Sequence, residues 1–205
     1  MSPTALEVSQ QVPEVRPAAK LSTAEFRVGR PEIVGPEKPE TPFPIILVGR
    51  VQRGFGRGGK DLGCPTANLP DESIIPMSSI ANTGVYYGYA QVVTPSGDST
   101  PMHPRDNGVL PMVMSLGWNP FYKNEKLTAE IHIMHEFDKD FYGFEMRAVV
   151  LGYIRPELDY TSREALIDDI EFDKQVALNC LERPEYRKYA QDPHFDLRCS
   201  VDTQI

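Results

Sequence analysis

The sequence has few cysteines, no excess of positive charge and no long apolar run, and each absence argues against a class of protein. Its three cysteines are widely spaced and form no C-x-x-C pair, which argues against a disulfide framework and a zinc site. A net charge of −8 leaves no broad basic face for a nucleic-acid backbone. The apolar runs are too short to span a membrane, and no basic-then-apolar leader opens the chain. We therefore expect a cytoplasmic protein that binds neither nucleic acid nor membrane.

Length and composition fit one domain of modest size. A chain of 205 residues with 40% apolar residues can bury a core of ordinary size. Residues 1–40 hold many of the prolines, mix charges of both signs and show no sustained period, so they predict a disordered extension. We expect the folded domain to occupy residues 41–196 and residues 197–205 to form a flexible tail.

Short extended segments dominate the first part of this domain. Proline and polar residues predict a loop at 71–81 and a surface excursion at 94–107. Aromatic and β-branched residues, in part alternating with smaller or polar ones, predict strands at 45–53, 66–69, 83–93, 109–116, 127–134 and 145–154.

Helical signals follow the last of these strands. Thr161 and Glu164 form a capping-box pattern before a predicted helix over 162–181, and Pro184 opens a short second helix. The apolar stripe expected on the longer helix comprises Leu166, Ile170, Ala177 and Leu181. Many short strands followed by two helices predict a mainly β protein, a small antiparallel Greek-key barrel with C-terminal α-helices.

A glycine-rich stretch, GFGRGGKDLGCPTAN at residues 54–68, is the most distinctive motif. Its five glycines leave backbone N–H groups open and permit positive φ, so the stretch can wrap several amides around a phosphate. The spelling matches both a P-loop and a dinucleotide fingerprint. We reject both, because Asp61 replaces the hydroxyl of a P-loop and because Gly63 and Pro65 prevent the helix that either motif requires. A surface hairpin loop remains the alternative to a phosphate-binding flap.

Two oxygen-bearing side chains follow the glycines. Thr66 and Asn68 are spaced i, i+2, which places both on one face of an extended segment. Hard oxygen ligands suit Mg²⁺, although two such ligands with phosphates also tolerate Zn²⁺ or Mn²⁺. The stretch therefore predicts a glycine flap for phosphates beside a divalent-metal site.

Glu130 is an acid within the strand predicted at 127–134. Alternation places it with Thr128 and His132 on one face, opposite an apolar face. An exposed strand face accommodates glutamate at little cost, and this interpretation is favoured when the strand is considered alone. A catalytic role is the alternative for Glu130, whereas His132 is interpreted as structural.

At these motifs the sequence resembles the riboflavin kinases, which transfer the γ-phosphate of ATP to the ribityl 5′-hydroxyl. The resemblance covers roughly residues 44–195, and its blocks are GRVQRGFGRGGKDLGCPTANLP, TGVYYGYA, SLGWNPFYKN, AEIHIMHEFDKDFYG and GYIRPE. No part resembles an attached adenylyltransferase, which fits the monofunctional eukaryotic type. The resemblance implies a six-stranded barrel, ATP and riboflavin as substrates, FMN and ADP as products, and Mg²⁺ as the metal.

The resemblance also implies roles for single residues. Thr66 and Asn68 match the metal side, and Glu130 matches the catalytic carboxylate. Arg155 and Tyr160 match the flavin side. The positions that match the ATP site are Gly54, Lys60, Ile133 (through its main chain), His135 and Tyr142.

Three more residues near these positions carry open alternatives. Leu158 and Ala165 stand in the flavin segment where other members of the family can carry polar residues. Trp118 follows the fourth predicted strand, and we favour loop packing over a direct role in the substrate pocket.

These assignments predict a mechanism. Amides of the flap, Lys60 and Mg²⁺ would stabilise charge on the transferred phosphoryl group, while Glu130 would accept the proton of the ribityl hydroxyl. The alternative function is a non-catalytic barrel module that binds flavin, nucleic acid or protein, and the acidic charge argues against nucleic acid. We expect a monomer.

Overall fold

The computed structural model describes residues 26–54, 63–80, 82–95, 102–118, 127–160 and 162–196. The predicted ATP contact Lys60 and the predicted tail 197–205 lie outside the described residues. Within the part of the chain that is described, no helix is long and apolar enough to cross a membrane.

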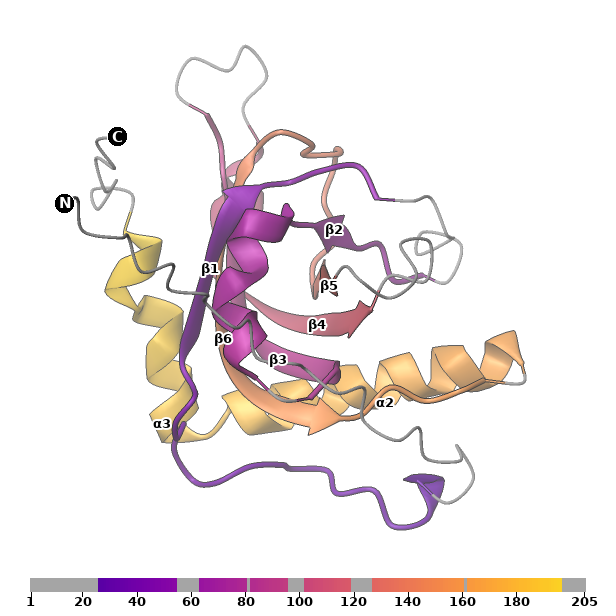
Figure 1. Cartoon of the computed structure of the whole chain (residues 1–205). Coiled ribbons are helices and arrows are strands. Elements are labelled where there is room, and N and C mark those ends of the chain that lie inside the picture. The colour runs from indigo at the N-terminus through magenta and orange to yellow at the C-terminus, as the bar shows by residue number, and fades with distance from the viewer. Residues whose placement is uncertain are drawn as a thin grey trace, which may run out of the picture.

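A single antiparallel sheet of six strands forms the centre of the molecule. The strands are β1 (Ile45–Arg50), β2 (Ala67–Asn68), β3 (Gly84–Val93), β4 (Leu110–Trp118), β5 (Leu127–Ile133) and β6 (Glu145–Arg155). Their spatial order is β1-β6-β3-β4-β5-β2. Beyond β1, the Gln52 N–H donates to the Asn68 carbonyl at 2.8 Å, which brings the two edge strands together. The sheet curls into a barrel (Figure 1), and the predicted fold is confirmed.

Both faces of this sheet are buried over part of their area. Alternation along β3 points Tyr86 into the barrel, where it joins a core with residues such as Leu47 and Ile131. The next residue, Tyr87, points outward and packs in a second core beneath the C-terminal helices, which includes Val149. The strands therefore carry apolar residues on both faces wherever a helix covers the outside.

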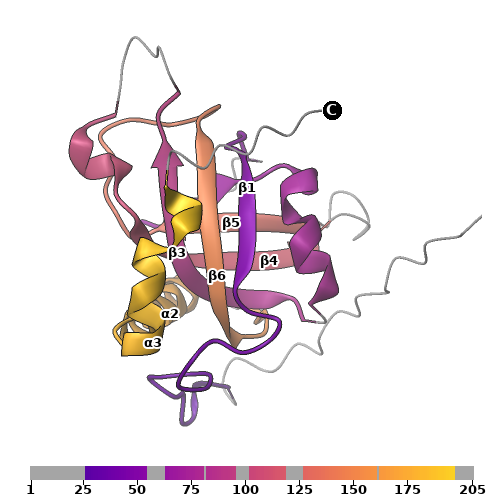
Figure 2. The ribbon, with the colours of Figure 1, turned by 90° about the vertical axis from the view of Figure 1, so that its left-hand side faces the viewer.

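A 3₁₀ helix, η1 (Asp71–Ser79), occupies the segment that the sequence predicted as a loop. Proline and serine disfavour an α-helix here, but the chain still turns tightly enough to bury Ile74 and Met77 in the inner core. Figure 2 shows η1 next to β1, on the opposite side of the sheet from the C-terminal helices.

Those helices are α2 (Arg163–Leu181) and the short α3 (Pro184–Arg187). The N-cap of α2 is Ser162, whose Oγ accepts the Ala165 N–H at 3.1 Å, so the capping position predicted at Thr161 is shifted by one residue. Ser162 takes this role because its backbone is still extended, with φ −141° and ψ 157°.

Residues 26–40 differ from the expected disordered extension. The structure places this segment along α2 and α3, where side chains of the helices bind its backbone carbonyls. Asn179 donates to Glu32 O at 3.0 Å and Tyr186 to Pro36 O at 2.9 Å. Composition could not indicate this, because the segment lacks a core of its own and is held by residues that lie far away in the sequence.

Candidate active site

The two residues of the predicted metal side and the predicted catalytic acid lie together on the outer face of the barrel. Strand β2 pairs with β5 so that Asn68 lies opposite Glu130. The Thr66 hydroxyl donates to Glu130 Oε2 at 3.3 Å. The neighbouring pair, Ala67 and Ile131, points into the barrel core. Glu130 itself is half-buried, so its carboxylate can still be reached from solvent.

The start of the glycine flap lies against this group. A Cβ placed on Gly54 would lie 2.4 Å from Asn68 Nδ2, closer than real contacts allow, so any larger residue would displace the Asn68 amide. The bridge between Gln52 and Asn68 fixes the chain just before this point. The flap therefore begins beside the predicted metal side.

Tyr142 lies beside Arg53, which precedes the flap. The Arg53 guanidinium is stacked 4.8 Å from the centroid of its ring, and the Gly143 N–H donates to Val51 O at 2.8 Å. Tyr142 remains exposed. The loop after β5 is thus tied to the residues that lead into the flap.

His135 is oriented by a residue that the sequence did not single out. Its Nε2 lies 2.7 Å from Oδ1 of Asp106, which is buried in the 3₁₀ helix η2 (Pro104–Asn107) of the surface excursion. Burial raises the pKa of Asp106, but the hydrogen bond and charge of His135 and the charge of Arg105 outweigh it, so the pKa is lowered. Ile133 is buried in the core, which leaves its main chain as the part that could meet a ligand.

On the predicted flavin side, Arg155 is a buried group with strong partners inside the protein. Its Nε lies 2.9 Å from both carboxylate oxygens of Asp173, and Nη2 lies 2.6 Å from Oδ2. Nη1 donates to the carbonyl of Pro156 at 3.0 Å. Burial raises the pKa of Asp173 even though Arg155 lowers it. Arg155 therefore binds α2 and the loop after β6, and it exposes little surface to a ligand.

The loop of residues 156–160 connects this pair with the barrel face that carries Glu130. A Cβ on Gly117 would lie 2.4 Å from Glu157 Oε1, so the Glu157 side chain packs directly on the backbone of β4. Thr128 of β5, two residues before Glu130, donates to Gly117 O at 3.2 Å. Within the loop, Leu158 is buried, which explains an apolar residue at that position.

Tyr160 closes the loop against α2. Its hydroxyl is buried, and burial raises the pKa of this phenol although the charge of Arg155 lowers it. Asp169 of α2 raises the pKa of Tyr160 further. The Tyr160 hydroxyl and Asp169 Oδ2 are both buried without a hydrogen-bond partner among the described residues.

His132 and Cys64 support the segment that leads to Thr66. The His132 Nδ1 lies 2.9 Å from Pro65 O, and burial lowers the pKa of this histidine. The Cys64 thiol is buried, which raises its pKa to about 11 and keeps it protonated at neutral pH. His132 thus has the structural contact that the sequence predicted, and Cys64 is not a reactive thiol.

Trp118 lies at the end of β4 and is half-buried. Its indole Nε1 is shielded from solvent and has no hydrogen-bond partner among the described residues. This placement is compatible with packing and with a role in the substrate pocket.

The donor set at Thr66 and Asn68 fits a hard divalent cation only with help from the substrate. No group of three or more His, Cys, Asp or Glu side chains suited to a metal occurs in the described ranges. Thr66 and Asn68 offer two oxygen ligands, and the remaining positions around Mg²⁺ suit phosphate oxygens and water.

Comparison with known proteins gives a consistent answer. A family model described as flavokinase, riboflavin kinase, matches residues 41–181, more than half of the chain. This chain belongs to the riboflavin kinase family. The family match begins after residue 40, so the segment along α2 and α3 lies outside it.

Individual relatives support this membership of the riboflavin kinase family. A riboflavin kinase from Scheffersomyces stipitis is 46% identical over 178 residues, which covers 79% of this chain and 98% of the relative. One from Pyricularia oryzae is 49% identical over 164 residues, which covers 75% of this chain and 80% of the relative. The crystal structure of riboflavin kinase from Trypanosoma brucei matches with a TM-score of 0.63 at 28% identity, covering 81% and 96% of the two chains.

Proposed function

We propose that this chain carries out riboflavin kinase chemistry with Glu130 as the catalytic carboxylate and Thr66 and Asn68 as the metal ligands. The activity follows from the family: the γ-phosphate of ATP is transferred to the ribityl 5′-hydroxyl of riboflavin, giving FMN and ADP. The observation that supports the residue roles is the convergence of Thr66, Asn68 and Glu130 on one face, where the flap begins.

Glu130 is suited to orient the acceptor hydroxyl and take its proton. It is half-buried, and its hydrogen bond from Thr66, at 3.3 Å, is long. A long bond is easily exchanged for one to a substrate hydroxyl. In a loose transition state the proton leaves late, so holding the oxygen in line with phosphorus contributes alongside basicity.

Thr66 and Asn68 would hold Mg²⁺ through the threonine hydroxyl and the amide oxygen, with Zn²⁺ or Mn²⁺ as possible substitutes. The cation would neutralise charge on the phosphates of ATP. Gly54, where the flap begins, lies close to the Asn68 amide and so places the start of the flap beside the proposed metal ligands.

The remaining ATP contacts would come from the flap and from the loop after β5. Lys60 supplies a positive charge for the phosphates, and the main chain of Ile133 offers hydrogen bonds to the base. His135 is held by Asp106, and Tyr142 keeps an exposed ring beside Arg53, just before the flap. Riboflavin would lie beside the 156–160 loop, with Tyr160 and Arg155 setting the position of that loop.

We further propose that the enzyme acts as a cytoplasmic monomer without nucleic-acid or membrane partners. The acidic net charge supports the absence of a nucleic-acid partner. The comparisons give no support to a non-catalytic binding module.

Incubation of the full chain with riboflavin, ATP and Mg²⁺, followed by chromatographic detection of FMN, tests the proposal. We expect FMN to accumulate, formation to stop with EDTA, and added Mg²⁺ to restore it. Replacement by Zn²⁺ or Mn²⁺ would rank the metals. Binding of riboflavin without FMN under all three metals would instead indicate a binding module.

A further inference from the structure

Two buried carboxylates on successive turns of α2 need explanation. Asp169 and Asp173 are spaced i, i+4, so their side chains lie on the same face of the helix, and both are almost fully buried. Like charges at this spacing repel, and a buried carboxylate without a cation is strongly unfavourable. The sequence predicted an apolar stripe on this helix, and Leu166 and Ile170 of that stripe are only half-buried.

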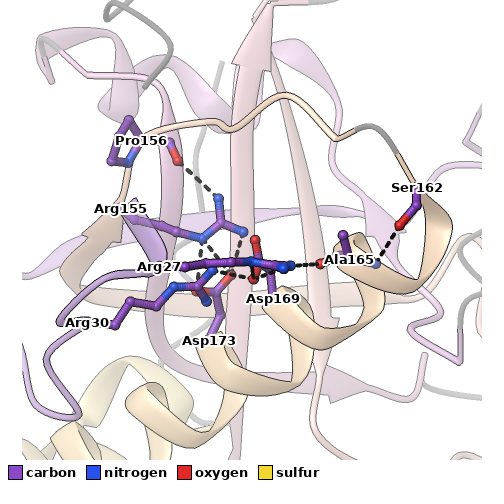
Figure 3. A network of polar contacts seen from close by, with 8 residues as sticks. All are labelled: Arg27, Arg30, Arg155, Pro156, Ser162, Ala165, Asp169 and Asp173. Atoms are coloured by element: carbon purple, nitrogen blue, oxygen red, sulfur yellow. Dashed lines mark hydrogen bonds and ion pairs between the residues drawn. The ribbon is translucent and has the colours of Figure 1, made fainter. Parts of the chain in front are cut away.

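Each carboxylate has its own arginine, from a different part of the chain (Figure 3). Asp173 binds Arg155 of β6. Asp169 makes a close ion pair with Arg30, whose side chain is 7% exposed and stacks between the rings of Phe26 and Phe172, 5.0 Å from each centroid. Burial by itself raises the pKa of Asp169, but the hydrogen bond and charge of Arg30, together with Tyr160 and the charge of Arg27, outweigh it and lower the pKa. Arg30 therefore holds the turn of α2 that carries Asp169, and Arg155 holds the next turn through Asp173.

Arg27 adds a second contact to the same turn. Its Nε donates to Asp169 Oδ1 at 3.1 Å and its Nη2 to the carbonyl of Ala165 at 2.7 Å. The Ala165 N–H also donates the N-cap bond to Ser162 Oγ, so Arg27 contacts the turn where the helix begins.

The segment is also attached at the far end of α2. Arg183 donates to Val34 O at 2.9 Å and to Pro36 O at 2.6 Å. We call residues 26–36 the N-terminal latch. In Figure 1 the latch runs beneath α2, and its contacts span nearly the whole helix.

The helix that the latch holds is the support of the loop on the flavin side. Asp173 binds Arg155, Arg155 binds the carbonyl of Pro156, and Glu157 packs on Gly117 of β4. At the other end of the loop, Ser162 accepts the Ala165 N–H and begins α2. A shift of the first half of α2 would therefore move both ends of the 156–160 loop.

We propose that the N-terminal latch, through Arg30 and Asp169, positions the 156–160 loop for riboflavin and so sets the affinity for the flavin. The latch precedes residues 41–181, which the family model matches. The inference rests on the proposed placement of riboflavin beside this loop. Arg30 is a positioning residue, since it acts through α2.

The test uses the full chain carrying Arg30→Gln. We expect the KM and Kd for riboflavin to rise about 3- to 10-fold, the range typical of coupling through a packed network. The kcat and the KM for ATP should stay within about twofold, because ATP and Glu130 are held by the flap and by β5. Arg30→Lys, which keeps the charge, should recover part of the riboflavin affinity. Lys188→Gln, which removes an exposed ion pair with Glu185, is the matched control.

Hydrogen exchange without substrate gives an independent readout. Residues 156–170 should exchange faster in Arg30→Gln than in the parent, whereas β5 should not change. If Arg30→Gln does not fold, Arg27→Gln disturbs the same carboxylate from its exposed side and should show the same pattern at smaller size.

Three results would overturn the latch proposal. The first is a lower Tm with unchanged riboflavin KM, which would make the latch a stability element only. The second is an equal rise in both KM values, and the third is unchanged exchange in residues 156–170. Absence of FMN with the parent chain would be a failure of the proposed function and is distinguished from these by the parent assay.

Discussion

Two polar regions border the candidate site, and they are bonded in opposite ways. On the β2 and β5 side, Glu130 is half-buried and accepts a hydrogen bond from Thr66 at the long distance of 3.3 Å. On the α2 side, Arg155 is buried and binds Asp173 at 2.6 Å and 2.9 Å. The first region can exchange its contacts for contacts with a substrate, whereas the second is already satisfied within the protein.

This difference suggests how work is divided between the two regions. A carboxylate with a long hydrogen bond loses little free energy when a ligand replaces its partner, so it is suited to act in catalysis. Removing one partner of a buried ion pair destabilises the fold by several kcal/mol, so such a pair is suited to hold neighbouring segments in place. Variants of each region should therefore separate activity from stability.

The largest effect is expected from Glu130→Gln. Gln keeps the shape of the side chain but cannot accept a proton, so kcat should fall on the order of 10²- to 10⁴-fold with nearly unchanged binding of both substrates. Unfolding free energy should change by less than about 0.5 kcal/mol. Glu136→Gln, in the exposed loop after β5, is the control. If Glu130→Gln and Glu130→Ala both kept the parent kcat, Glu130 would be a solvated strand residue.

Asp173→Asn should have the opposite effect, with a large loss of stability. It leaves the buried Arg155 without its counter-charge, so the free energy of unfolding should fall by about 3–5 kcal/mol, measured by urea denaturation. Adding Arg155→Met should recover part of the stability, because it removes the buried charge that Asp173→Asn leaves without a partner. It should not recover riboflavin affinity, because the tie to Pro156 is lost. A loss of activity without loss of stability in Asp173→Asn would contradict the division of work.

Thr66→Ala and Asn68→Ala should affect the metal more than the flavin. We expect each to lower turnover at limiting Mg²⁺ by roughly 10- to 100-fold, with partial recovery at high Mg²⁺. Riboflavin binding, followed by quenching of its fluorescence, should change little. Thr94→Ala removes a hydroxyl bonded to Asn107 away from the site and serves as the control. Equal loss of riboflavin affinity in both site variants would make them structural.

The smallest effect concerns Asp106, which holds His135. Its folded pKa is lowered from 3.8, so the carboxylate contributes stability above that pH and loses it as pH falls through the folded value. Asp106→Asn should cost about 1 kcal/mol near neutral pH, since the amide keeps an acceptor but loses the charge. The difference from the parent should shrink below pH 3.8 in denaturation curves. A difference that is constant down to low pH would show that the charge of Asp106 does not stabilise the fold.

Much of the fold and part of the site could be predicted because they depend on local signals. Each of the six predicted extended segments overlaps a strand of the barrel, although β4 and β6 run one or two residues further, since alternation and side-chain type act over a few residues. The spacing of Thr66 and Asn68, and the position of Glu130 opposite the apolar face, also follow from a period of two. Asp71–Ser79 is an exception, because proline and serine hid a 3₁₀ helix that only burial against the barrel makes favourable.

The tertiary structure decided which of these residues meet. The pairing of β2 with β5 places Asn68 opposite Glu130, and such a pairing leaves no mark in either segment alone. The burial of Asp169 depends on Arg30, 139 residues away, and the burial of Asp173 depends on Arg155. The sequence by itself determined the strands, the glycine flap and the set of chemical groups. Only the fold decided that two acids would be buried in α2. Their burial costs free energy, and ion pairs with arginines from other parts of the chain offset that cost.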